Sequence, residues 1–347
     1  MRPAECLEGL HLEGGWRVDA IVHHPPTSTG GCFSVGYVAI NEDGRMGYLK
    51  ALDFSSAFTA PDMSRALEAM TAAYNFERDL LDRCKHRRLK RVVIPLAGGT
   101  VQVPGNFGDL GNVCYLIFEL ASGDIRKEAS TWQAFDLAWA LRSLHQTATG
   151  LRQLHSIGIA HQDLKPSNVL AYPETGCKVA DLGCASCIDA PSETDGFVTP
   201  GDPGYAPPEQ WYGWHQSPDF AWRYVADLYL LGSLFFFYFL RCSATHAIHL
   251  KISKIHRKQF SRTDFLQDLP YIQHAFVEAL HDLTVAIKDF SGHLTSEIVM
   301  LAKQLCEPDP RLRGDPKTLS SMIAQHNLQP YISRLDRLAR YAEARMI

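Results

Sequence analysis

The stretch IAHQDLKPSNVLAYPETGCKVADLG, residues 159–183, decides how the rest of the chain is interpreted. Pro166 disfavours a continuous helix here, so Asp163, Lys165 and Asn168 are expected on a loop. This loop therefore presents a carboxylate, an ammonium group and a side-chain amide close together in the sequence.

Two short β-type runs, residues 169–172 and 177–180, follow this loop and are separated by Pro-Glu-Thr-Gly, the pattern of a β-hairpin. If the strands pair around this four-residue turn, Asn168 and Asp181 flank its open end, where opposed residues stand about 5 Å apart at Cβ. An amide oxygen and a carboxylate suit Mg²⁺, which leaves other positions for water and phosphate. With a carboxylate to orient a hydroxyl and a cation for developing charge, the segment meets the needs of phosphoryl transfer.

Length, apolar content and net charge limit the classes of protein to which this chain can belong. The chain has 347 residues, of which 46% are apolar, enough to fill one large domain or two lobes with their own cores. Its net charge of -4 gives no overall basic field, so neither nucleic acid nor membrane is expected as a partner. The N-terminal residues include acidic groups and no apolar run, unlike a secretory signal.

Two further features bear on location. The most apolar run, residues 228–240, is shorter than the roughly 20 residues of a membrane-spanning helix, so a buried core helix is expected. The cysteines are scattered and odd in number, which is typical of reduced thiols. Cys184 and Cys187 form a CxxC pair, but no second pair completes a zinc site. We expect a cytoplasmic protein.

The character of the chain changes near residue 120. Before it, β-type runs dominate with one helical interruption, and beyond it helical patterns prevail. The β-type runs are residues 17–22, 35–40, 47–52 and 114–120. Asp43 and Gly44 predict a tight hairpin turn with positive φ angles, which pairs the second and third runs. The helical interruption has one apolar stripe from Met63 to Cys84, and Glu77 lies on that stripe.

Two helical patterns mark the second half. Leucines at helical spacing between Leu137 and Leu154 predict an amphipathic helix just before the loop. Residues 331–346 place Ile332 and Leu335 on one face with several arginines opposite. This last segment is either a terminal helix packed on the helical part of the chain or a separate partner-binding helix.

The motifs resemble the protein kinase superfamily, and the resemblance covers nearly the whole chain. Residues 161–168, HQDLKPSN, look like the kinase catalytic loop, and residues 181–183, DLG, like the metal-binding triplet with Leu182 in place of phenylalanine. Lys165 follows Asp163 by two residues, which is the pattern of serine/threonine kinases. His161 is interpreted as a packed structural residue.

Later segments extend the resemblance. Residues 205–209, YAPPE, look like the end of the activation segment. Asp227 and Gly232 match the start of the buried helix that supports the catalytic loop. Arg313 lies in a late motif whose arginine is implied to pair with Glu209.

The resemblance implies a role for each site residue. Lys50 matches the lysine that holds the α- and β-phosphates of ATP, and Glu77 matches its helix partner. The place of Glu77 on the apolar stripe supports this pairing, because a carboxylate buried there without a cation costs several kcal/mol in desolvation. Asp163 and Lys165 are the catalytic pair. Asn168 and Asp181 are the implied Mg²⁺ ligands, and the other implied nucleotide contacts are Gly30, Gly31 and Val35 of the glycine-rich loop, Glu119 and Ala121 of the hinge, and Asp124 toward the ribose.

Further positions depart from the family pattern. Ser28 and Phe33 stand where the glycine-rich loop has glycines, which allow backbone amides to approach phosphate closely. Gln162 replaces the arginine that in many kinases pairs with a phosphorylated activation loop. We therefore predict that phosphorylation of the loop is not the main on-switch. Asp202 replaces a threonine near Asp163, where a second carboxylate either repels Asp163 or recruits a different substrate. The available loop hydroxyls are Ser192, Thr194 and Thr199.

The sequence as a whole predicts an α+β, bilobal kinase-like fold. A small antiparallel β-sheet lobe with one helix is expected over residues 1–118, a hinge over 119–122, and a larger, mainly helical lobe over 123–347. ATP with Mg²⁺ is expected in the cleft, with transfer of the γ-phosphoryl group to serine or threonine hydroxyls of a protein substrate. Two alternatives remain: a nucleotide-binding pseudokinase and a small-molecule phosphotransferase. The oligomeric state is left open.

Overall fold

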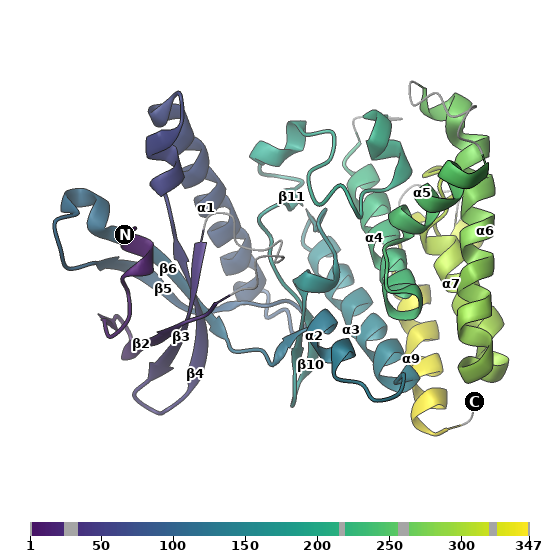
Figure 1. The fold of residues 1–347 in the computed structure, drawn as a ribbon, viewed down its shortest axis with the longest axis horizontal. Coiled ribbons are helices and arrows are strands. Elements are labelled where there is room, and N and C mark those ends of the chain that lie inside the picture. Colours follow the sequence, from purple (N-terminus) through teal and green to yellow (C-terminus); the bar gives the residue numbers. More distant parts are fainter. Residues whose placement is uncertain (1, 24–33, 215–218, 256–263, 319–324, 346–347) are drawn as a thin grey trace. The chain divides into compact units, whose positions relative to one another are not determined.

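The computed structural model describes residues 2–23, 34–214, 219–255, 264–318 and 325–345. It divides the chain into two compact units. The N-terminal unit runs to Arg88 and resumes from Val93 to Ser122, and the C-terminal unit contains Leu89–Val92 and the chain from Gly123 onward. Figure 1 shows the larger sheet and helix α1 in the first unit, and most of the helices in the second. The predicted α+β class, with an antiparallel sheet followed by a mainly helical part, is confirmed.

A six-stranded sheet organises the N-terminal unit (Figure 1). Its order is β1-β2-β3-β4-β6-β5, and each neighbouring pair is antiparallel. The strands are β1 (His11–Leu12), β2 (Trp16–Ile21), β3 (Ser34–Asn41), β4 (Met46–Leu52), β5 (Pro95–Gln102) and β6 (Asn112–Glu119). The four predicted runs therefore correspond to β2, β3, β4 and β6, with ends that differ by one or two residues.

The turn between β3 and β4 differs from the prediction. The two strands pair as expected, with Asn41 donating its backbone N–H to the Arg45 carbonyl at 3.0 Å. The Asn41 side chain also accepts a hydrogen bond from the Arg45 N–H. Of the two residues predicted to have positive φ, only Gly44 does, at +77°. A longer loop therefore joins the strands, and it needs one left-handed residue instead of two.

An N-terminal segment covers part of the sheet, which the sequence did not reveal. Ala4 and Leu7 are buried in one core with Trp16 and other sheet residues. Tyr37 of β3 donates its hydroxyl hydrogen to the Ala4 carbonyl at 2.7 Å. Burial raises the pKa of the Tyr37 hydroxyl to about 12, so it remains a donor at neutral pH.

The helix of this unit, α1 (Met63–His86), begins where Asp62 accepts a hydrogen bond from the Arg65 N–H, a common N-terminal cap. Its first turns are exposed or half-buried. The buried side chains lie further along: Tyr74, Glu77, Leu80, Leu81 and Cys84. The predicted stripe is thus confirmed in its second half, which includes Glu77.

Helices α2 to α9 make up most of the C-terminal unit (Figure 1). They are α2 (Ile125–Ser130), α3 (Leu137–His155), α4 (Ala221–Leu240), α5 (Ala244–Ile255), α6 (Phe265–Ser291), α7 (Thr295–Leu305) and α9 (Gln329–Glu343). Two small sheets accompany them, with the strands β7 (Gly123–Asp124), β8 (Ile159–Ala160), β9 (Val169–Tyr172), β10 (Gly176–Val179) and β11 (Ser186–Cys187).

Helix α4 is the buried helix predicted from the apolar run. Among the described residues it is the helix with the length and hydropathy to cross a membrane, yet 83% of its most apolar window is buried inside the protein. Helices α5 and α7 pack against it. The helix therefore serves as the core of its unit.

Helix α9 packs on α3. Of the two alternatives left by the sequence, a packed helix and a separate partner-binding helix, the structure therefore favours the packed helix. Its buried face is apolar. Arg142 of α3 binds both Asp336 and Glu343 of α9, at 2.7 and 2.8 Å. These hydrogen bonds lower the pKa of both carboxyl groups.

Candidate active site

The hairpin of β9 and β10 carries both predicted metal ligands at its open end. Val169 pairs with Val179, and the Ala180 N–H donates to the Asn168 carbonyl at 2.9 Å. Asn168 therefore stands opposite Ala180, and Asp181 follows one residue later, so the register is shifted by one residue from the opposition of Asn168 and Asp181 expected from the sequence. The turn is shorter than predicted, because Gly176 already pairs with Tyr172.

Both carboxylate oxygens of Asp163 have partners within the C-terminal unit. Oδ2 accepts a hydrogen bond from the Asn168 side chain at 3.0 Å and lies 3.1 Å from the Lys165 Nζ. Oδ1 accepts from the Asp202 backbone N–H at 2.7 Å. The three loop residues predicted to act together are thus in contact.

Asp227 of α4 holds the backbone that precedes Asp163. Its carboxylate accepts the N–H groups of His161 and Gln162, each at 2.8 Å, and also faces the His155 ring. His161 is fully buried, with its two ring nitrogens near the Ala180 carbonyl and the Asp163 N–H. The structural role expected for His161 fits these contacts.

Two residues of the site have left-handed backbone conformations. Gln162 has φ of +64° and Asp181 has φ of +65°. Such conformations are uncommon outside glycine and cluster at functional sites. The Gln162 side chain donates to the Arg223 carbonyl at 2.8 Å, which fixes this residue in place.

The oxygen donors at the hairpin suit a hard cation. Asp181 is exposed, and Asn168 is buried with its amide nitrogen donating to Asp163. That contact leaves the Asn168 Oδ1, which faces the Ser167 hydroxyl at 3.2 Å, as the oxygen donor. Among the described residues no group of three or more His, Cys, Asp or Glu side chains is arranged to hold a metal ion, so a metal here also needs oxygens from water or a phosphate. The residues present therefore fit Mg²⁺ carried by a nucleotide.

In the N-terminal unit, Lys50 of β4 binds Glu77 of α1. The Lys50 Nζ lies 3.1 and 3.0 Å from the two Glu77 oxygens. Glu77 is 8% exposed, so the ion pair compensates a carboxylate largely removed from water. The pairing expected from the stripe is present.

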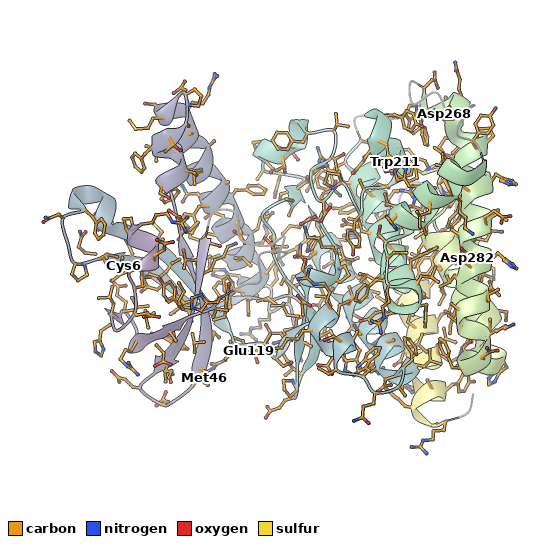
Figure 2. The ribbon with its side chains drawn as sticks, viewed as in Figure 1. Cys6, Met46, Glu119, Trp211, Asp268 and Asp282 are labelled. Carbon is orange, nitrogen blue, oxygen red and sulfur yellow. The ribbon has the colours of Figure 1, made fainter. Side chains whose placement is uncertain are left out.

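The remaining predicted nucleotide contacts stay predictions, and the structure gives the positions of those residues that it describes. Gly30 and Gly31, with Ser28 and Phe33, lie outside the described residues. Val35 is on β3, and Glu119 ends β6, where Figure 2 labels it.

Ala121 and Asp124 follow β6 in the sequence. Ala121 is half-buried, and Asp124 caps helix α2 by accepting the N–H groups of Arg126 and Lys127. Asp124 also forms an ion pair with the Arg126 side chain at 2.6 Å. A ribose contact by Asp124 stays a prediction.

Glu209 and Arg313 form the ion pair implied by the family motifs. Two parallel hydrogen bonds of 2.7 and 2.8 Å join them, and Arg313 is fully buried. Burial alone would lower the pKa of Arg313, but the Glu209 carboxylate outweighs it and raises the pKa. Nearby, Trp211, labelled in Figure 2, donates its indole N–H to the Ala206 carbonyl. The end of the activation segment is therefore fixed to the core of its unit.

Arg223 is a site residue that sequence reasoning missed. It donates to the Ser186 hydroxyl at 2.8 Å and lies 3.2 Å from the Asp195 carboxylate. Asp195 also accepts the Ser192 N–H, which closes a short turn of the activation segment. No sequence signal marks this contact, because Arg223 belongs to helix α4 and Asp195 to a short 3-10 helix 28 residues earlier.

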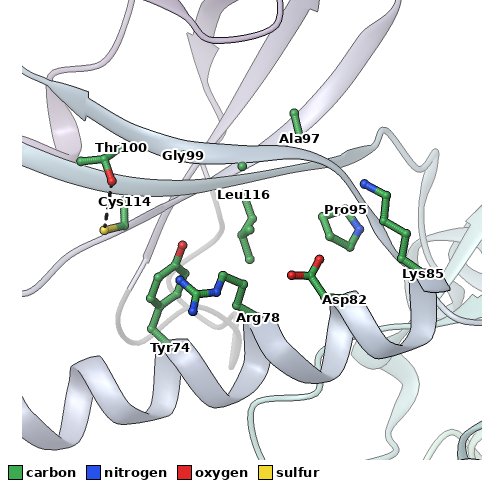
Figure 3. Close-up of a pocket in the computed structure, with 11 residues that line it drawn as sticks. Tyr74, Arg78, Asp82, Lys85, Pro95, Ala97, Gly99, Thr100, Cys114 and Leu116 are labelled. Atoms are coloured by element: carbon green, nitrogen blue, oxygen red, sulfur yellow. Dashed lines mark hydrogen bonds between the residues drawn. The ribbon is translucent and has the colours of Figure 1, made fainter.

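A pocket of about 290 Å³ lies in the N-terminal unit between α1 and the strands β5 and β6 (Figure 3). Its lining residues include Tyr74, Arg78, Asp82 and Lys85 along one face of α1. None of the predicted site residues lines it. We therefore exclude it from the candidate active site.

Comparisons with known proteins agree with this geometry. A family model described as the protein kinase domain matches residues 59–327. The chain is 30% identical over 227 residues to the serine/threonine-protein kinase PknA of Mycobacterium tuberculosis, a match that covers 65% of this chain and 46% of PknA. It is 35% identical over 106 residues to the serine/threonine-protein kinase PLK4 of Xenopus laevis, covering 30% of this chain and 11% of PLK4. A match to mitogen-activated protein kinase 4a of Physcomitrium patens has 30% identity over 135 residues, 38% of this chain and 32% of that protein. The matched part spans less than half of the length of each relative.

Proposed function

Because this chain belongs to the protein kinase family, on a family match that covers more than half of its length, we propose that it transfers the γ-phosphoryl group of ATP to serine or threonine hydroxyls of proteins. The observation that carries the proposal is the contact network of Asp163, Lys165 and Asn168. Phosphoryl transfer depends on positioning and charge stabilisation, and this network supplies both.

Each residue has a role in the proposed reaction. Asp163 accepts a hydrogen bond from the acceptor hydroxyl and orients it toward the phosphoryl group. Lys165 stabilises charge that develops on that group. Asn168 and Asp181 would hold Mg²⁺, which when bound neutralises charge on the nucleotide phosphates. Lys50, held by Glu77, would bind the phosphates that remain on the nucleotide.

The serine/threonine preference rests on Lys165 and on the printed names of the relatives. Protein substrates, and not nucleic acid or a membrane surface, are the proposed partners. A cytoplasmic location is proposed from the cysteines, which are free wherever the structure describes them.

A labelling experiment tests this proposal. The full chain is incubated with γ-labelled ATP and Mg²⁺, with a mixture of unstructured Ser/Thr-rich and Tyr-rich proteins, beside Asp163→Ala. We expect labelled phosphoserine or phosphothreonine with the wild-type chain and a loss of at least about 100-fold in the variant. Label on tyrosine alone, or on a small metabolite, would reject the proposed substrate class. Binding of ATP with no transfer would identify a pseudokinase.

A further inference from the structure

The catalytic loop lies against a second carboxylate, that of Asp202. Its Oδ2 is 3.4 Å from the Lys165 Nζ, on which the Asp163 Oδ2 also converges at 3.1 Å. The side chains of Lys165, Asp163 and Asp202 are 12, 9 and 24% exposed. Water therefore screens these charges less than it screens a surface ion pair. The Asp202 carboxylate therefore faces the Lys165 ammonium group. This contact offsets the repulsion between Asp202 and Asp163 that the sequence left open.

The backbone fixes the position of Asp202. Its N–H donates to the Asp163 Oδ1 at 2.7 Å. Gly201 makes this approach possible, because a Cβ there would lie 2.7 Å from that same oxygen and 2.5 Å from the Gln162 carbonyl. An alanine at Gly201 would therefore push the segment away from the catalytic loop.

The two oxygens of Asp202 have different partners. Oδ1 accepts the Gly204 N–H at 2.8 Å, and Oδ2 faces Lys165. A side chain with a single acceptor oxygen, such as threonine, could not face both the Gly204 N–H and the Lys165 ammonium group as the two carboxylate oxygens do. Asparagine could keep the contact with Gly204, but it would turn an amide NH₂ group toward the ammonium group. Both oxygens of the carboxylate are thus in use.

Charge balance favours a protonated Lys165. Burial lowers the pKa of its ammonium group, but Asp163 and then Asp202 outweigh burial, and the pKa is raised. An ammonium group has three donors. Two of them have a carboxylate within ion-pair distance, which leaves one for a phosphoryl oxygen.

We propose that Asp202 is a positioning residue that acts through Lys165: the carboxylates of Asp163 and Asp202 hold the ammonium group in one place, with one donor directed to the transferred phosphoryl group. This inference rests on the proposed kinase function and goes beyond it. A preoriented cation stabilises the transition state without a cost of reorganisation at the moment of reaction. Asp202 thus affects the rate of transfer and not the binding of ATP.

A double-mutant cycle tests the inference. Asp202→Asn is made in the wild-type chain and in Lys165→Ala, and Glu174→Gln serves as a matched control for the loss of one negative charge, because Glu174 is exposed in the β9–β10 turn. Turnover is measured with excess enzyme in a single turnover, so that slow variants remain measurable. Thermal melting of each variant checks that it is folded.

We expect Asp202→Asn to lower the transfer rate roughly five- to tenfold in the wild-type chain, with KM for ATP within about twofold. In the Lys165→Ala chain the same change should alter the rate by less than about twofold. Glu174→Gln should leave both constants unchanged. Asp202→Glu, which keeps the charge, should recover part of the loss.

Other results would overturn the inference. Equal losses in the two backgrounds would mean that Asp202 acts through the fold and not through Lys165. An unchanged rate, or a change in KM alone, would also reject it. If the wild-type chain transferred no phosphoryl group to any protein, the proposed function itself would fail, which is a separate outcome.

Discussion

Glu209→Gln is expected to destabilise the C-terminal unit strongly. The change removes the charge that faces Arg313, a side chain with no exposure to solvent. Leaving one partner of a buried ion pair uncompensated costs about 3–5 kcal/mol. The carbonyl groups of Glu307 and Val225 still accept from Arg313, so we expect the lower end, about 3 kcal/mol. For a unit of this size that corresponds to a fall in Tm of about 6–12 °C.

Circular dichroism melting curves measure this effect. Arg337→Met is the control, because Arg337 forms an ion pair with Glu297 but is 54% exposed, and such pairs contribute under about 1 kcal/mol. The double variant Glu209→Gln/Arg313→Met should be more stable than Glu209→Gln alone, since it removes the unpaired charge. A fall in Tm for Glu209→Gln no larger than that for Arg337→Met would refute the reasoning.

Three further predictions concern regulation, pH and the lysine pair. Replacing all three activation-segment hydroxyls by alanine should keep turnover within about threefold, because the Asp195 carboxylate already faces Arg223; complete loss of labelled product would contradict this. The hydroxyls are those of Ser192, Thr194 and Thr199. Arg142 lowers the pKa of Asp336 and Glu343, so its contribution to stability is present above their ordinary pKa range and is lost as pH falls through the lowered values. In acid titrations of stability, Arg142→Met should flatten this dependence, and an unchanged slope would argue against it. Lys50→Met should raise KM for ATP by about tenfold or more, because it removes the proposed phosphate contact, and equal KM values would exclude that role.

The catalytic loop was predictable because its chemistry is local in the sequence. Asp163, Lys165 and Asn168 lie within one loop, and the hairpin that follows fixes the position of Asp181. Helical spacing placed Glu77 on the buried face of α1, which predicted a cationic partner. Hydrophobic periodicity and turn-forming residues therefore predicted the parts of the site whose residues are close together in the sequence.

Other features depend on contacts that no local pattern encodes. Strand β5 was missed because its sequence, PLAGGTVQ, has two central glycines and lacks the β-branched alternation of a strand. The N-terminal segment packs on the sheet through Ala4 and Leu7, whose short apolar pattern indicates no particular partner. The contact of Arg223 with Asp195 joins helix α4 to a short 3-10 helix far from it in the sequence.

Asp202 shows how a departure from a family pattern is resolved. From the sequence, a second carboxylate next to Asp163 was as compatible with repulsion as with recruitment of another substrate. The structure shows that Lys165 lies within ion-pair distance of both carboxylates, and that the Asp202 backbone donates to Asp163. The charge of one lysine offsets the repulsion between the two carboxylates, and its position could not be read from spacing alone.

Calorimetric titration with ATP, with and without Mg²⁺, tests most directly that these residues serve a magnesium nucleotide. The wild-type chain should bind one ATP, and binding should weaken by about tenfold or more when Mg²⁺ is withheld or when Asp181 is changed to Asn. Equal affinity in all three titrations, or no binding of ATP at all, would contradict the account.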